Sequence, residues 1–199
     1  MRVIAGIYRS RILKSLKGLA LRPTSDRLRE TLFNVLGARV SNSRFLDLFA
    51  GTGAIGIEAL SRGAASVTFV ENHPPAAALI RRNLESLKIT TGANVIVSDA
   101  LRALGSLSAK HKSTDPTVDY VFLDPPYAAA EDYTRILRFL GSAGFLAPEA
   151  VVIAEHHHKF ALADRFGSLE RIRVLKQGDA ALSFYRPSPL PEKENSAPE

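Results

Sequence analysis

The sequence has no cysteine, which excludes a disulfide framework and a zinc site built on thiolates. It also has no run near the roughly 18 apolar residues of a membrane span. Arginines interrupt the apolar pieces at the start, where a signal peptide would carry a hydrophobic stretch. We therefore expect a cytoplasmic protein with no membrane partner. Its 199 residues, 46% of them hydrophobic, suffice for one substantial core.

Positive charge is concentrated near the amino terminus. Residues 1–30 contain eight lysines or arginines and two acids, a net charge of +6 that equals the net charge of the whole chain. Such a field is typical of a surface that follows a phosphate backbone, although basic residues also protect exposed strand edges. The candidates for RNA contact are Arg9, Arg11, Lys14 and Arg22.

The most informative motif is Asp124-Pro125-Pro126-Tyr127, which follows the apolar run Val118–Leu123. Two consecutive prolines fix φ at about −65° and donate no backbone hydrogen bond, so they form a stiff turn where the strand ends. The turn presents a carboxylate, a proline carbonyl and an aromatic ring together. The two acceptors suit the hydrogens of an exocyclic amine, and the ring can stack on a planar base. Alone, the motif could equally be a strand-ending turn with a surface tyrosine.

A glycine-rich turn lies earlier in the chain, between an expected strand and an expected helix. The strand Arg44–Phe49 contains Asp47, and the turn runs through Ala50, Gly51 and Gly53. Glycine lets the backbone turn sharply and approach a ligand at the N-terminus of the following helix. This arrangement is typical of a nucleotide-binding site.

Acidic residues close the next two expected strands. Glu71 follows Val67–Val70 and is placed to accept hydrogen bonds from a ribose diol. Asp99 ends the expected strand Asn94–Asp99, and Ala100 begins the next helix. Up to this point the pattern also fits a dinucleotide-binding module of the dehydrogenase type.

The order of four acids makes the interpretation more specific. Asp47, Glu71, Asp99 and Asp124 resemble the ordered motifs of class I S-adenosylmethionine-dependent methyltransferases that act on exocyclic amines. Further stretches are similar to the RsmD family, bacterial methyltransferases that modify guanine N2 in small-subunit ribosomal RNA. These stretches are Met1–Gly6, Arg22–Glu30, Ala59–Ala64 and Asp179–Tyr185, and the resemblance extends to about Arg186.

The resemblance implies a cofactor, a catalytic group and a partner. The cofactor is S-adenosylmethionine, and the residues that would hold it are Asp47, Ala50, Gly51, Gly53, Glu71, Asp99, Ala100 and Thr24. The catalytic residues would be Asp124, Pro125, Pro126 and Tyr127. The partner would be ribosomal RNA, naked or within an assembling small ribosomal subunit, and we expect the enzyme to be a monomer.

The alternation of elements predicts a Rossmann-like α/β fold, in which a mostly parallel seven-stranded sheet carries helices on both faces. Strands are expected to end near Phe49, Glu71, Asp99, Leu123 and Glu155, and helices to span Gly53–Arg62, Pro75–Leu87, Ala100–Ser108 and Glu131–Leu140. An earlier helix is capped by Thr24 or Ser25, and Gly37 ends it. Two late strands, Leu169–Leu175 and Ala181–Tyr185, supply an antiparallel edge.

We divide the chain into three parts. Residues 1–22 form a basic N-terminal β-hairpin extension, with strands at Arg2–Tyr8 and Arg11–Leu16. Residues 23–186 form the methyltransferase domain. Residues 187–199 contain too little apolar content to pack and form a disordered tail.

The triplet His156-His157-His158 raises the question of a metal site. Alternate residues of an extended segment face opposite sides, so at most two of the three histidines could share a face. With no cysteine in the chain, we expect no structural zinc. We interpret the triplet as a loop at the mouth of the active site.

Two alternatives to guanine methylation stay open. The same tetrad could serve a DNA or RNA adenine N6-methyltransferase, although a sequence-specific DNA enzyme would need an added recognition domain. A dinucleotide-binding module without methyl transfer would leave the Asp124–Tyr127 motif without a role. We therefore expect methyl transfer from S-adenosylmethionine to N2 of a specific guanine in 16S ribosomal RNA.

Overall fold

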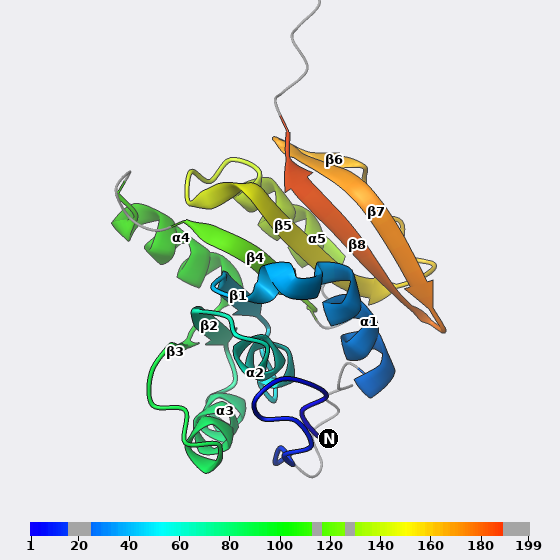
Figure 1. The fold of residues 1–199 in the computed structure, drawn as a ribbon. Coiled ribbons are helices and arrows are strands. Elements are labelled where there is room, and N and C mark those ends of the chain that lie inside the picture. The colour runs from blue at the N-terminus through cyan, green and yellow to red at the C-terminus, as the bar shows by residue number, and fades with distance from the viewer. Residues whose placement is uncertain (16–24, 113–116, 126–129, 189–199) are drawn as a thin grey trace, which may run out of the picture.

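A computed structural model describes residues 1–15, 25–112, 117–125 and 130–188 of the chain (Figure 1). The helices are α1 (Asp26–Leu36), the 3-10 helix η1 (Gly37–Val40), α2 (Ala54–Ser61), α3 (Pro74–Ser86), α4 (Ala100–Lys110) and α5 (Ala130–Leu140). The strands are β1 (Arg44–Leu48), β2 (Ser66–Glu71), β3 (Ala93–Val97), β4 (Val118–Leu123), β5 (Leu146–His157), β6 (Arg165–Phe166), β7 (Leu169–Gln177) and β8 (Ala180–Pro187).

One mixed sheet contains these strands in the order β3-β2-β1-β4-β5-β8-β7-β6. Strands β1 to β5 are parallel, and β8, β7 and β6 add antiparallel pairs at one side. The predicted Rossmann-like α/β class is confirmed. Over the described ranges the sheet has eight strands instead of seven, because Gly167 adopts a φ of 61° and the chain turns so that Phe166 pairs with Leu169.

Helices cover both faces of the sheet (Figure 1). Each face has its own apolar core. Side chains alternate along β4, so that Tyr120 and Phe122 lie in the core beneath α1, α2 and α3, whereas Val121 and Leu123 lie in the core beneath α4 and α5. A strand buried on both faces is a continuous apolar run in sequence, as Tyr120–Leu123 of β4 is.

Helix α1 begins and ends where the sequence predicts. Ser25 is the N-cap, and its hydroxyl accepts a hydrogen bond of 3.1 Å from the Leu28 N–H. Gly37 follows the helix with a φ of 61°, a conformation that glycine adopts without strain. The apolar side chains of the helix are buried at Leu28, Leu32, Phe33 and Leu36, whereas Val35 is only partly buried.

The predicted N-terminal hairpin is far shorter than expected. Its two segments form one isolated bridge, between Arg2 and Ile12, and the Val3 N–H donates to the Arg11 carbonyl at 2.9 Å. Long strands do not form because the backbone N–H groups of Ile4 and Ala5 donate to a side chain of α2 instead. Leu16, where the second strand was expected to end, lies outside the described residues.

Two further observations concern membrane-spanning helices and the C-terminal end of the chain. No helix in the described ranges is both long and apolar enough to cross a membrane. The expected tail at 187–199 begins within β8, which ends at Pro187, and residues 189–199 lie outside the described part of the chain.

Candidate active site

The candidate site lies at the carboxyl ends of the parallel strands, where the strand order reverses. The chain runs outward from β1 through β2 to β3 and then returns to place β4 on the other side of β1. At such a reversal of strand order, the helical connections on its two sides cover opposite faces of the sheet. A crevice is left between them, and this is where open α/β sheets bind ligands. The four acids named from the sequence therefore lie at or just beyond one edge of the sheet.

A tight loop joins β1 to α2 beside this crevice. Phe49, Gly51 and Gly53 all have positive φ values, of 61°, 54° and 78°. The Gly53 N–H closes the turn by donating to the Ala50 carbonyl at 2.7 Å, and Gly53 is the N-cap of α2. A phenylalanine in the left-handed region is strained, and such strain is commonly found at ligand sites.

Glu71 holds this loop against the end of β2. Its Oε2 accepts the Gly51 N–H at 2.7 Å, and its Oε1 accepts the His73 N–H at 2.8 Å. The residue is 7% exposed. Each carboxylate oxygen has a second lone pair, so Glu71 could fix the two loops and still accept hydrogen bonds from a ribose diol.

Asp47 lies beneath the loop instead of facing the crevice. It is 1% exposed, and its Oδ2 accepts the Gly56 N–H of α2 at 3.0 Å. Burial raises the pKa of Asp47 to about 7, the Gly56 hydrogen bond opposes this rise, and the charge of Glu71 adds to it. Asp47 is therefore placed to set the position of α2, and with it the glycine-rich loop.

Gly56 has a packing role that the sequence did not reveal. A Cβ at this position would lie 2.3 Å from the ring of Phe69 in β2. Glycine therefore lets α2 approach the sheet closely. Its N–H completes the link to Asp47 described above.

The raised pKa of Asp47 predicts a pH dependence of stability. Between the unfolded value of 3.8 and the folded value of about 7, rising pH ionises the unfolded state before the folded state, so the contribution of Asp47 to stability falls. Asp47→Asn keeps an acceptor for Gly56 but does not titrate. The unfolding free energy of the wild type minus that of the variant should decrease by roughly 3 kcal/mol from pH 5 to pH 8, as measured in urea. Parallel pH curves would contradict the role of burial.

Asp99 and Ala100 lie at the start of α4. Asp99 is exposed and caps the helix by accepting the Arg102 N–H at 3.1 Å, whereas Ala100 is buried. Strand β3 ends at Val97, two residues before the expected end, because the capping residue must leave the strand. Asp99 therefore lies just beyond the end of β3. The neighbouring strand in the sheet is β2, which ends at Glu71.

Asp124 and Pro125 follow β4 directly. Leu123 pairs with Leu48 of β1, so Asp124 comes level with Phe49 at the start of the glycine-rich loop. Asp124 is half-buried and Pro125 is buried. The other predicted catalytic residues, Pro126 and Tyr127, lie outside the described residues, as do Thr24 and Arg22.

The basic N-terminal segment is fixed to α2. Glu58 accepts the Ile4 N–H at 2.8 Å and the Ala5 N–H at 3.0 Å, and the Ile7 N–H donates to the Ser61 carbonyl at 2.8 Å. A Cβ on Gly6 would lie 1.8 Å from the Ser61 carbonyl oxygen, so only glycine fits there. The segment is thus outside the sheet but is bonded to the helix that begins at the glycine-rich loop.

One of the eight N-terminal cations does not lie at the surface. Arg29, counted among the eight N-terminal cations, is fully buried and faces Glu58, with 3.8 Å between Arg29 Nε and Glu58 Oε2. Arg62 also pairs with Glu58, at 2.8 Å. The cations of the described N-terminal residues that remain exposed are Arg2, Arg9, Arg11, Lys14 and Arg27.

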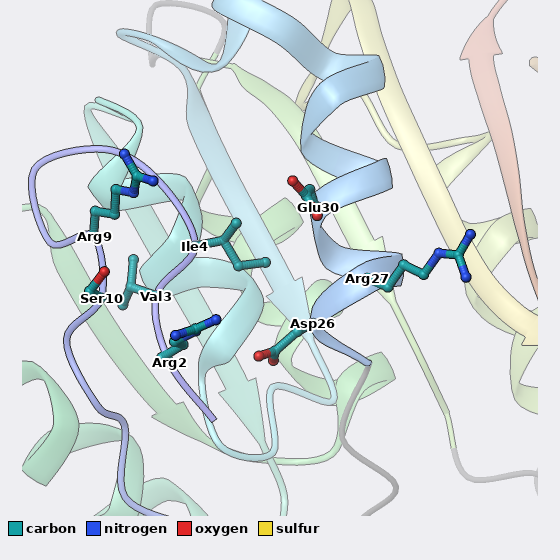
Figure 2. Close-up of a pocket in the computed structure, with 8 residues that line it drawn as sticks. All are labelled: Arg2, Val3, Ile4, Arg9, Ser10, Asp26, Arg27 and Glu30. Atoms are coloured by element: carbon teal, nitrogen blue, oxygen red, sulfur yellow. The ribbon is translucent and has the colours of Figure 1, made fainter.

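A cleft of about 360 Å³ separates the N-terminal segment from α1 (Figure 2). Arg2 and Arg9 line it from the segment, and Asp26 and Glu30 line it from α1. Figure 2 shows Arg27 directed away from the N-terminal segment. The cleft therefore offers both cations and hydrogen-bond acceptors to a polar ligand.

The interpretation of the histidine triplet as a loop is wrong for two of its members. His156 and His157 belong to β5 and pair with Ala181 and Ala180 of β8. His156 is buried, its Nε2 lies 2.8 Å from Ser183 Oγ, and burial lowers its pKa. The strand extends this far because β8 continues beside it, which is a contact distant in sequence.

Comparison with known proteins gives the family. The model of the RsmD family, described as Conserved hypothetical protein 95, matches residues 1–186. The chain belongs to this family. An RsmD-family relative from Haemophilus influenzae, named Ribosomal RNA small subunit methyltransferase D, is 40% identical over 189 residues, covering 94% of this chain and 92% of the relative.

Solved structures agree with the fold of this RsmD-family chain. A structure titled putative methyltransferase yhhF from Escherichia coli has a TM-score of 0.81 at 31% identity and covers 94% of this chain and 98% of its own. A more distant likeness, to an RNA methyltransferase from Salinibacter ruber in complex with S-adenosyl-L-homocysteine, has a TM-score of 0.62 at 18% identity, over 86% of this chain and 97% of that one. This second likeness shows the fold alone.

Proposed function

We propose that this protein transfers a methyl group from S-adenosylmethionine to the exocyclic N2 of a guanine in small-subunit ribosomal RNA. One observation carries the proposal: Asp124 and Pro125 directly follow β4, the strand next to β1, level with the glycine-rich loop that Glu71 holds. An acceptor pair for an amine and a loop suited to a nucleoside cofactor therefore share one crevice. The name of the Haemophilus influenzae relative supports ribosomal RNA as the substrate.

The residues present fit the cofactor. The Glu71 carboxylate is buried at the end of β2 with lone pairs left for a ribose diol, and α2 starts at a glycine in a left-handed conformation. The Salinibacter ruber protein of similar fold was crystallised with the demethylated form of S-adenosylmethionine. When bound, S-adenosylmethionine supplies a methyl group activated by its sulfonium.

The chemical task of the protein is to prepare the amine. Guanine N2 is a weak nucleophile because its lone pair is delocalised into the ring. The Asp124 carboxylate and the Pro125 carbonyl accept its two hydrogens, which favours a tetrahedral nitrogen whose lone pair can attack the methyl group. A nitrogen–carbon bond forms as the sulfur–carbon bond breaks, and Asp124 takes the proton that the nitrogen then loses. The base must leave its stack to enter the crevice.

The exposed cations of the N-terminal segment and the cleft in Figure 2 provide an RNA-binding surface. The segment is bonded to α2 through Glu58 and Ser61, so RNA held there has a fixed position relative to the glycine-rich loop. Arg9, Arg11 and Lys14 are all exposed. We propose that these three bind the phosphate backbone without reading the sequence.

The decisive experiment identifies the modified nucleoside. Purified protein is incubated with S-adenosylmethionine and with either naked small-subunit RNA or partly assembled subunits from a strain that lacks the gene. Mass spectrometry of the digested RNA should show N2-methylguanosine at one position. N6-methyladenosine would instead establish the adenine alternative, and the absence of any methylated nucleoside with both substrates would overturn the proposed function.

Removing charge from the segment should weaken RNA binding without affecting the cofactor. The triple variant Arg9→Ala, Arg11→Ala, Lys14→Ala should bind RNA less tightly than the wild type does. The loss of affinity should be the same for unrelated RNA sequences. Its log–log salt slope should flatten by about 0.7 to 0.9 for each phosphate group that the variant no longer binds. Fluorescence anisotropy at several salt concentrations measures both effects.

The matched control removes three exposed cations from other surfaces. Arg82, Arg138 and Lys176 lie on α3, α5 and β7. Their replacement by alanine lowers the net charge by the same amount. Any change in RNA affinity that comes from net charge alone should therefore appear in this control as well. Equal RNA affinity and salt slope in the two triple variants would mean that the N-terminal segment is only a charged edge.

A further inference from the structure

The end of β5 and the turn between β7 and β8 bring three metal-binding side chains together. His157 is the last residue of β5, His158 follows it, and Asp179 lies in the turn before β8. One ligand atom from each residue lies within 4.8 Å of the others. We propose that this cluster binds a divalent transition-metal ion such as Zn²⁺.

The backbone explains how two neighbouring histidines come together. Within a strand their rings would face opposite sides, but the chain turns after His157, and the two rings stack with centroids 4.7 Å apart. The turn is fixed because the His158 N–H donates to the Asp179 carbonyl at 2.8 Å. That same bond keeps the Asp179 residue next to both rings.

The donor set selects a class of ion. Two imidazoles and one carboxylate suit zinc and its neighbours among the transition metals, whereas Mg²⁺ and Ca²⁺ prefer oxygen ligands. Three protein ligands leave a fourth position of a tetrahedral ion for water. All three residues are at least partly accessible to solvent, so an ion could enter without unfolding of the strand.

Two further contacts bear on ion binding. His158 Nδ1 is buried and has no hydrogen-bond partner within the described ranges, and a ligand at this ring would offset that cost. His157 Nδ1 accepts the Lys159 N–H at 3.1 Å. Ion binding would replace this bond, and because Lys159 lies at an exposed turn, water can take over as acceptor.

The experiment measures Zn²⁺ binding to protein that carries no polyhistidine tag, by calorimetry and by thermal unfolding. The wild type should bind one ion, and its melting temperature should rise. Asp179→Asn and His158→Gln should each weaken binding by at least about tenfold. A large excess of Mg²⁺ should not displace the ion.

His111→Gln is the control, because His111 lies at the end of α4 and contacts Phe145. It should bind Zn²⁺ as the wild type does. Asp179 is exposed in a turn, so its variant tests the cluster even if His158→Gln folds poorly. The proposal is overturned if Zn²⁺ does not bind, if it binds either folded cluster variant with wild-type affinity, or if Mg²⁺ competes equally.

Discussion

Asp124→Ala is expected to reduce methyl transfer by about 10²- to 10⁴-fold, the range for a positioned acceptor or base, while S-adenosylmethionine affinity stays nearly unchanged. The reason is position: Asp124 follows β4, whereas Gly51 lies in the loop after β1 and Glu71 ends β2. We therefore expect the carboxylate to face the base and not the adenosine. A tritiated-methyl assay measures the first effect, and calorimetry with the cofactor measures the second.

Two further variants sharpen this test. Asp124→Asn keeps the shape of the side chain but cannot take up the proton, so its activity should also fall. Glu149→Ala removes an exposed carboxylate from the first half of β5, and its activity should match that of the wild type. Retention of more than roughly a tenth of the wild-type rate by Asp124→Ala would mean that Asp124 is not the catalytic acceptor.

The order of the elements could be predicted because it depends on local patterns. Continuous apolar runs gave the buried strands, and Ser25 and Gly37 gave the ends of α1. The fold class then placed Glu71, Asp99 and Asp124 at one edge of the sheet, since the ends of parallel strands meet there. None of these steps required contacts between distant parts of the chain.

The parts that could not be predicted depend on contacts distant in sequence. Arg29 counts as a cation of the basic segment, but only the packing of α1 on α2 shows that it is buried beside Glu58. His156 belongs to a strand because β8 pairs with it. The hydrogen bond from the Gly56 N–H to Asp47 likewise depends on the packing of α2 against β1.

Glu58 is the residue whose loss should most reduce stability. It is fully buried, pairs with Arg29 and Arg62, and accepts the N–H groups of Ile4 and Ala5. Glu58→Ala would leave the buried Arg29 with the half-exposed Asp26, 3.1 Å away, as its remaining ion-pair partner among the described residues, and it would remove the acceptor of two backbone N–H groups. Together these losses cost about 3 to 5 kcal/mol of unfolding free energy. Urea unfolding measures the loss. Glu85→Ala, at an exposed position on α3, should change stability by less than about 0.5 kcal/mol.

The same substitution separates the anchoring of the N-terminal segment from its charge. Without the Glu58 carboxylate, the amides of Ile4 and Ala5 lose their acceptors, so their hydrogen exchange should become fast before the strands exchange. RNA affinity should fall although every exposed cation is still present, because the segment no longer has a fixed position beside α2. If exchange at Ile4 and Ala5 stays slow in a folded Glu58→Ala protein, other contacts hold the segment, and the bonds between Ser61 and the backbone of Ile7 and Tyr8 become the first to test.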